Sequence, residues 1–171
     1  MFLLFLFEVI TILLIITTAL FIHEMGHAIV VLLQDKKAKA EIYLGSYSKE
    51  KKLRVPLGRL TLYLSIAFSG LCSVSNAQEL SPSSNMQRFL FLAGGPIASL
   101  LGFVSLYFIS NLIPGVLGII VNRIAFASLF IAITSSLPFT YPAFLGGLPS
   151  DGLLMFNLWK KARKKTKERT I

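Results

Sequence analysis

Residues 2–33 read FLLFLFEVITILLIITTALFIHEMGHAIVVLL, a run in which Glu8 is the only charged residue before Glu24. A helix needs about 20 apolar residues to cross the hydrocarbon core of a bilayer, so the part up to Ile22 is nearly long enough alone. The run exceeds the about 7–15 residues of a signal-peptide core and ends without a small-residue cleavage site. We therefore expect a retained membrane helix, with the polar residues 23–27 towards its far end.

The composition of the whole chain also points to the bilayer. The 171 residues are 54% hydrophobic and 15% charged, with a mean hydropathy of +0.72. Soluble domains carry about 25% charged residues. Cys72 is the single cysteine, which excludes an intramolecular disulfide and a thiolate metal cluster. We expect one integral membrane domain rather than two soluble ones.

The net charge of +9 is gathered in two blocks. Of the 17 Lys and Arg residues, eight lie between Lys36 and Arg59 and seven between Lys160 and Arg169. Basic blocks beside apolar spans follow the positive-inside rule, and attraction to anionic lipid accounts for them without a nucleic-acid partner. The rule places the C-terminus in the cytoplasm and the N-terminus outside. Small size and the lack of targeting sequences favour a multi-pass protein of a bacterial plasma membrane.

The texture of the sequence changes after the first helix. Residues 42–44 and 53–55 are short β-type runs, and residues 60–66 alternate between apolar and polar types with a period of two, as a half-buried strand does. Residues 38–68 therefore predict a small β-sheet or hairpin at the cytoplasmic surface. Residues 69–85 are rich in serine and are predicted to form a loop.

Two further membrane spans are expected, at about 89–113 and 124–141. A third span that began at Gly115 would place Arg123 about 12 Å deep at about 1.5 Å per residue, which is costly for an unpaired cation. We therefore place Arg123 at the outer interface. The remaining segments are predicted to be a broken return to the cytoplasmic side (138–149), a short interfacial helix (152–159) and a basic cytoplasmic tail (160–171).

The sequence His23-Glu24-Met25-Gly26-His27 has the HExxH pattern. Positions i and i+4 share one face of a helix, so both imidazoles can reach one metal ion, and Glu24 can deprotonate a metal-bound water. Two buried histidines beside a stray glutamate are the alternative. Against it, these are the only histidines in the chain, and a charged group at membrane depth costs at least about 2.5 kcal/mol. The pattern predicts a zinc site.

A catalytic zinc ion needs a third protein ligand. Glu8 is about four turns from His23 on the same helix, and most other acids lie in polar surface segments. Elimination leaves Asp151, which ends a segment rich in proline and glycine. Asp151 could equally serve as the N-cap of a helix after Gly152, and the residues alone leave both roles open.

Three groups of residues resemble the site-2 protease family of intramembrane zinc metalloproteases. They are HEMGH in the first span, Gly95-Pro96-Ile97-Ala98-Ser99 in the second, and Leu137-Pro138 followed by Ser150-Asp151-Gly152. The resemblance covers the three-span core in the family's order. It implies zinc held by His23, His27 and Asp151, with Glu24 as general base, below the cytoplasmic membrane surface. It also implies that an edge of the β-type segment can pair with an unfolding substrate.

The chain departs from the family pattern at two amide positions. The GPxxN motif ends in Ser99, and Ser135 replaces the Asn of the NxxP motif. Ser99, Ser135, Pro96 and Pro138 are the substrate-binding positions that the resemblance implies, and a serine has a shorter reach than an asparagine. The expected fold is an all-α membrane core, residues 1–159, of three transmembrane helices with a small β insertion.

Three functions are weighed. The first is an intramembrane zinc metalloprotease that cuts membrane-embedded or small apolar peptides in the lipid bilayer. The second is a catalytically inactive relative that binds a partner peptide, which the two serine replacements motivate. The third is a metal transporter, which two histidines and no chain of acidic residues through the spans disfavour. The sequence indicates no substrate identity, cleavage position, trigger or oligomeric state.

Overall fold

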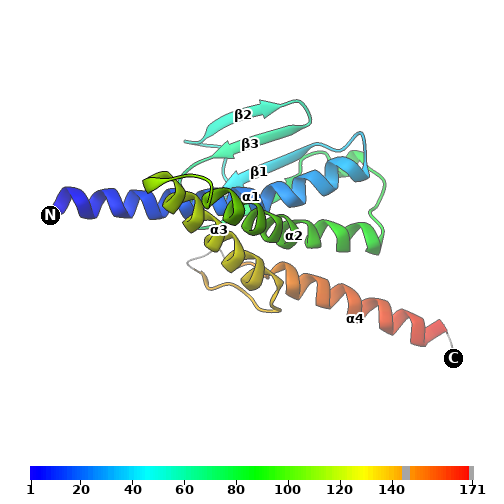
Figure 1. The fold of residues 1–171 in the computed structure, drawn as a ribbon. Helices are drawn as coiled ribbons and strands as arrows, with labels where there is room; N and C mark the ends of the chain where they lie inside the picture. Colours follow the sequence, from blue (N-terminus) through cyan, green and yellow to red (C-terminus); the bar gives the residue numbers. More distant parts are fainter. Residues whose placement is uncertain (144–146, 170–171) are drawn as a thin grey trace.

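The structure is a computed structural model that describes residues 1–143 and 147–169. Three of its helices are long and apolar enough to cross a membrane: α1 (Phe2–Gln34), α2 (Asn85–Ser110) and α3 (Gly115–Ser136). They pack against one another, with a small sheet on one side of α1 and a fourth helix on the opposite side of the molecule (Figure 1). The mostly helical fold with three membrane-spanning segments, expected from the sequence, is confirmed.

The third span differs from its prediction. α3 begins at Gly115 and ends at Ser136, rather than covering 124–141, so Arg123 lies within the helix. The prediction was wrong because it kept this cation out of the span. In the structure Arg123 is an exposed residue of α3 and lines a pocket of about 430 Å³ together with Glu8 of α1.

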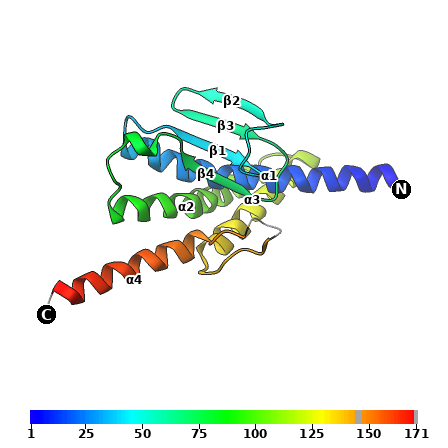
Figure 2. The ribbon, with the colours of Figure 1, turned by 180° about the vertical axis from the view of Figure 1, so that it is seen from behind.

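The insertion after α1 is a four-stranded sheet. Its order is β2-β3-β1-β4, with β1 parallel to β3 and the other two pairs antiparallel. The strands are β1 (Ala40–Leu44), β2 (Leu53–Leu57), β3 (Leu60–Leu64) and β4 (Gly70–Val74), and a 3₁₀ helix follows at Ala77–Glu79. β4 lies in the stretch predicted to be a serine-rich loop. It is an edge strand, and Figure 2 shows it next to the helices.

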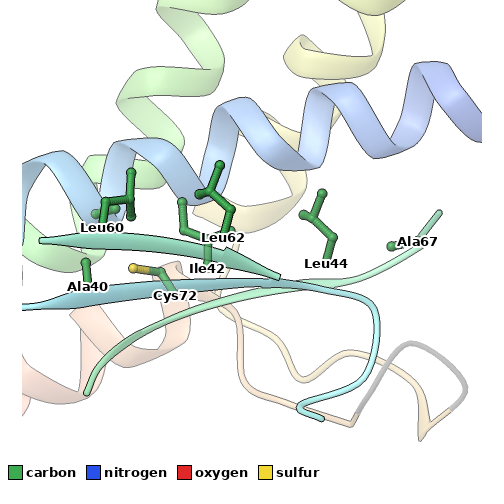
Figure 3. Close-up of a cluster of buried hydrophobic side chains, with 8 residues drawn as sticks. Ala40, Ile42, Leu44, Leu60, Leu62, Ala67 and Cys72 are labelled. Carbon is green, nitrogen blue, oxygen red and sulfur yellow. The ribbon is translucent and has the colours of Figure 1, made fainter. Parts of the chain in front are cut away.

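One face of the sheet packs against α1 through a cluster of buried apolar side chains (Figure 3). Ala28 of α1 belongs to this cluster and is fully buried. Past the end of β3, the Thr17 hydroxyl of α1 donates to the Ala67 carbonyl and accepts from its N–H. The sheet is therefore fixed along the second half of α1. The strand residues of the cluster are Ala40, Ile42, Leu44, Leu60, Leu62 and Cys72.

The fourth helix, α4 (Asp151–Arg169), is longer than the predicted helix at 152–159 and continues through the basic tail. Before α4, Thr140 and Pro149 form an isolated antiparallel bridge. Lys and Arg are good helix formers, and cations near a helix C-terminus are favoured. Lys160 also lies over the Phe156 ring at 4.4 Å, which supports the helix at an i, i+4 spacing.

Candidate metal centre and active site

The two histidines of HEMGH occupy one face of α1, as an i, i+4 pair must. Their Nε2 atoms are 3.3 Å apart, and the two rings meet edge to face with centroids 4.9 Å apart. Both residues are buried, as is Glu24 between them. The α1 helix alone therefore brings two imidazole nitrogens to one point inside the protein.

Helix α2 orients both imidazoles through contacts with their Nδ1 atoms. The Nδ1 atom of His27 donates to the Phe91 carbonyl at 2.7 Å, which leaves the lone pair on Nε2. The Nδ1 atom of His23 lies 2.9 Å from the Ser99 hydroxyl, which is fully buried. Partners of this kind at Nδ1 are the usual support for histidines that bind a metal through Nε2.

Asp151 completes the group from the first position of α4. Its Oδ2 atom lies 3.1 Å from His23 Nε2 and 3.5 Å from His27 Nε2. The helix cap is supplied by Ser150, whose hydroxyl oxygen accepts from the Leu153 N–H at 3.1 Å and whose own proton goes to the Leu137 carbonyl. Because Ser150 fills the capping role that the sequence left open for Asp151, the aspartate carboxylate is directed at the histidines instead.

The spacing of these three atoms fits a tetrahedral metal ion. His23, His27 and Asp151 each offer one ligand atom, and these atoms lie within 4.8 Å of one another. Zinc–ligand bonds of about 2.0–2.1 Å in tetrahedral geometry require ligand atoms about 3.3 Å apart. The observed separations of 3.1, 3.3 and 3.5 Å agree with this value. The three side chains together could hold a metal ion and leave a fourth position open.

Glu24 points past the histidines towards strand β4. A Cβ atom added at Gly70 would lie 2.7 Å from Glu24 Oε1, so the carboxylate lies against the strand backbone. The glutamate therefore lies between the three candidate metal ligands and the edge of the sheet.

These residues open into a cavity of about 860 Å³. Strand β4 and the residues before it form one wall, α1 and α3 form others, and the turn before α4 closes the side near Asp151. Most of the lining is apolar, as in sites that bind apolar ligands. The apolar lining includes Ile16, Leu20, Phe68, Leu71, Phe91, Ala127, Phe130, Ile131, Leu148 and Leu154.

None of the four predicted substrate-binding residues is among the described residues that line the cavity. Ser99 bonds to His23, and the buried Ser135 is close to the Ala132 carbonyl, 3.4 Å away. Pro96 lies inside α2, and Pro138 is exposed after α3. Contact of these residues with a substrate stays a prediction.

Two features of the site were missed by sequence reasoning. One is β4, which forms the cavity wall beside Glu24. The other is the role of Gly95, where an added Cβ atom would lie 2.6 Å from His23 Nε2. The small residues around Gly95 indicate close helix packing; the structure shows that the space is taken by the imidazoles. The signal in the sequence was present, since Gly95 belongs to the motif quoted for the family resemblance.

The fold and the site together define a class: a membrane protein whose apolar cavity holds a set of side chains fit for a metal ion. A comparison with family models is more specific, because residues 11–170 match peptidase family M50. The chain therefore belongs to family M50, the site-2 protease family of metalloproteases. A comparison with curated proteins found no match.

Proposed function

We propose that this protein is an intramembrane zinc metalloprotease that cleaves membrane-embedded or small apolar peptides. Membership of family M50 supports metalloprotease activity in general. The observation that carries the specific proposal is the triangle of His23, His27 and Asp151, whose edges match the ligand spacing of tetrahedral zinc. The buried Glu24 beside the triangle supplies a proton acceptor at the same point.

In this proposal each residue has one role. His23, His27 and Asp151 hold the metal, and Ser99 and the Phe91 carbonyl keep the imidazoles in place. A zinc ion there would polarise the scissile carbonyl and lower the pKa of a water molecule to about 7. Glu24 accepts a proton from the attacking water as its oxygen bonds to the carbonyl carbon. Glu24 then gives that proton to the nitrogen as the C–N bond breaks.

The free edge of β4 supports a mode of substrate binding. The Gly45 N–H bonds to the Ser69 carbonyl, so Ser69 and every second residue after it face β1. The backbone groups of Gly70 and Cys72 consequently point away from β1, and among the described residues no strand pairs with them. A substrate in extended form can add to this edge and would then pass Glu24.

This mode of binding requires an unwound substrate. A helix already uses its own backbone N–H and C=O groups, so a transmembrane segment must open locally before it pairs with β4. The apolar cavity then shelters its side chains. The distribution of basic residues supports an orientation with the C-terminus in the cytoplasm and the N-terminus outside. A bacterial plasma membrane is part of the same proposal.

The test is the replacement of Glu24 by glutamine, which keeps the shape and removes the base. Wild-type protein, Glu24→Gln and the surface control Glu50→Gln are purified, assayed for zinc and incubated in vesicles with a panel of single-span substrates. We expect all three to hold zinc and Glu24→Gln to lose at least about 10²–10⁴-fold in cleavage rate. Equal turnover by Glu24→Gln contradicts the proposed role. Binding of the panel without cleavage by the wild type would favour the inactive, partner-binding alternative.

A further inference from the structure

Hydrolysis of an amide needs a group that stabilises the negative charge on the carbonyl oxygen, and a hydrogen-bond donor commonly assists the metal in this. The serine hydroxyls at the predicted substrate-binding positions are poorly placed for this role. Ser99 is fully buried against His23, and Ser135 lies against the backbone of α3. A donor on another wall of the cavity is therefore of interest.

The wall near Asp151 carries three hydroxyl side chains: Thr134, Tyr141 and Ser150. Thr134 donates to the Phe130 carbonyl at 2.8 Å, and Ser150 donates to the Leu137 carbonyl. Both protons are therefore committed to the backbone. Tyr141 is half-buried and lines the same cavity as Asp151 and Glu24.

The backbone fixes Tyr141 relative to Asp151. Its N–H donates to the Leu148 carbonyl at 2.9 Å, and the Ser150 N–H donates to the Phe139 carbonyl at 2.9 Å. These bonds form a short antiparallel ladder around the pair Thr140 and Pro149. One arm of the ladder carries Tyr141 and the other leads directly into Asp151, so the phenol and the aspartate carboxylate are placed by the same structure.

The phenol also has a proton to give. Thr134 on the same wall gives its own proton to the Phe130 carbonyl and is a neutral group. A neutral hydroxyl is a weaker acceptor than an oxygen that carries negative charge. The Tyr141 hydroxyl therefore bonds more strongly to a charged oxygen in the cavity than to a neutral neighbour, while the ring stays packed on Phe139, 4.8 Å away.

We propose that Tyr141 is a catalytic residue whose hydroxyl donates a hydrogen bond to the scissile carbonyl oxygen as negative charge develops on it. The proton stays on the phenol throughout, so the residue stabilises charge and transfers none. This inference rests on the proposed protease function and adds a residue to it. It assigns the turn between α3 and α4 two roles, since the turn delivers both a metal ligand and the donor.

The test compares Tyr141→Phe with Tyr107→Phe, which removes a hydroxyl from an exposed residue of α2 that does not line the cavity. Loss of an oxyanion donor commonly costs about 10²–10³-fold in kcat. We expect a loss of that size in Tyr141→Phe, with KM and zinc content unchanged, and no loss in Tyr107→Phe. Stoichiometric zinc in Tyr141→Phe shows that the site is still assembled.

A second measurement does not depend on turnover. An apolar phosphinic peptide presents charged oxygens in tetrahedral geometry, and calorimetry gives its affinity for the zinc-loaded proteins. We expect Tyr141→Phe to bind it at least about 10-fold more weakly, the usual effect of one hydrogen bond to a charged group. Wild-type kcat and phosphinate affinity in Tyr141→Phe overturn the inference and leave the protease function standing. A wild-type protein that neither cleaves substrates nor binds the phosphinate overturns both.

Discussion

The two halves of α1 are both mostly apolar in sequence and have opposite roles. Phe2, Leu3 and Leu4 are 71–77% exposed, and the first turns extend beyond the rest of the molecule (Figures 1 and 2). Every buried residue of α1 lies from Ile15 onward. The first half presents its side chains to the surroundings, and the second half meets the sheet and α2.

Residue size distinguishes the apolar residues at which the second half is contacted from those of the first half. The first half carries phenylalanine and leucine on all sides. In the second half the helix is contacted at Ala19, Gly26 and Ala28, and a Cβ atom at Gly26 would collide with the Gly94 carbonyl of α2. Small residues let helix backbones approach closely where water gives no driving force. The close approach brings Ser99 and Phe91 to the histidines.

Among the substitutions that test this comparison, Gly95→Ala should have the largest effect on zinc content and cleavage rate. The added methyl group would lie within 2.6 Å of His23 Nε2, in the space that the metal-binding atoms need. We expect loss of bound zinc and a fall in cleavage of at least about 10²-fold, the cost of displacing a reacting group by about 1 Å. Zinc analysis and the vesicle assay measure both.

Gly102→Ala on the same helix is the matched control, because its methyl group would lie 2.9 Å from Ile22 Cγ2 and has no candidate metal ligand among its nearest contacts. Ile22 must shift to make room, so stability should fall while zinc is retained. A full zinc content in Gly95→Ala would show that zinc binding does not require the close approach of α1 and α2.

A smaller and more selective effect is expected from Gly70→Ala in β4. Its methyl group would lie 2.7 Å from Glu24 Oε1 but does not touch the metal ligands in the contacts that the structure gives. We expect zinc to be retained while kcat falls by about 10²-fold. Ser73→Ala in the same strand removes a buried hydroxyl without a partner and should leave kcat unchanged. Equal activities of the two variants would show that the position of Glu24 does not depend on contact with the sheet edge.

The smallest expected effect is on the free energy of unfolding, and it compares one substitution in each half of α1. Ala28→Leu overpacks the cluster between α1 and the sheet, where Ala28 is fully buried, and should cost about 1–3 kcal/mol. Leu4→Ala changes an exposed residue and should stay within about 0.5 kcal/mol. Thermal unfolding of both variants in one detergent gives the difference. A larger loss in Leu4→Ala would mean that the first half of α1 has a partner after all.

Sequence reasoning succeeded where chemistry is local. HEMGH fixes the relative position of two imidazoles because residues i and i+4 lie on one face of a helix. The apolar runs predicted two of the three spans to within a few residues. Asp151 could be singled out but not placed, because its position depends on the ladder between Phe139 and Ser150. That ladder joins residues with no repeating pattern.

Both errors fall where the chain meets a segment that is distant in sequence. Gly70–Val74 has no clear alternation and becomes a strand because β1 pairs with it and Cys72 packs in the sheet core. α3 starts eight residues before Arg123, which lines a pocket together with Glu8 of another helix. In each case the neighbouring segment lies more than 20 residues away in sequence, so a local pattern does not reveal it.

The measurement that tests the account most directly is the zinc content of three purified proteins. We predict about one zinc ion per chain in the wild type and in Glu41→Ala, an acid on the outer face of the sheet bonded to Lys49. Asp151→Ala, which keeps the Ser150 cap, should lose the metal. Stoichiometric zinc in Asp151→Ala, or its absence from the wild type, would contradict a metal ion held between α1 and the start of α4.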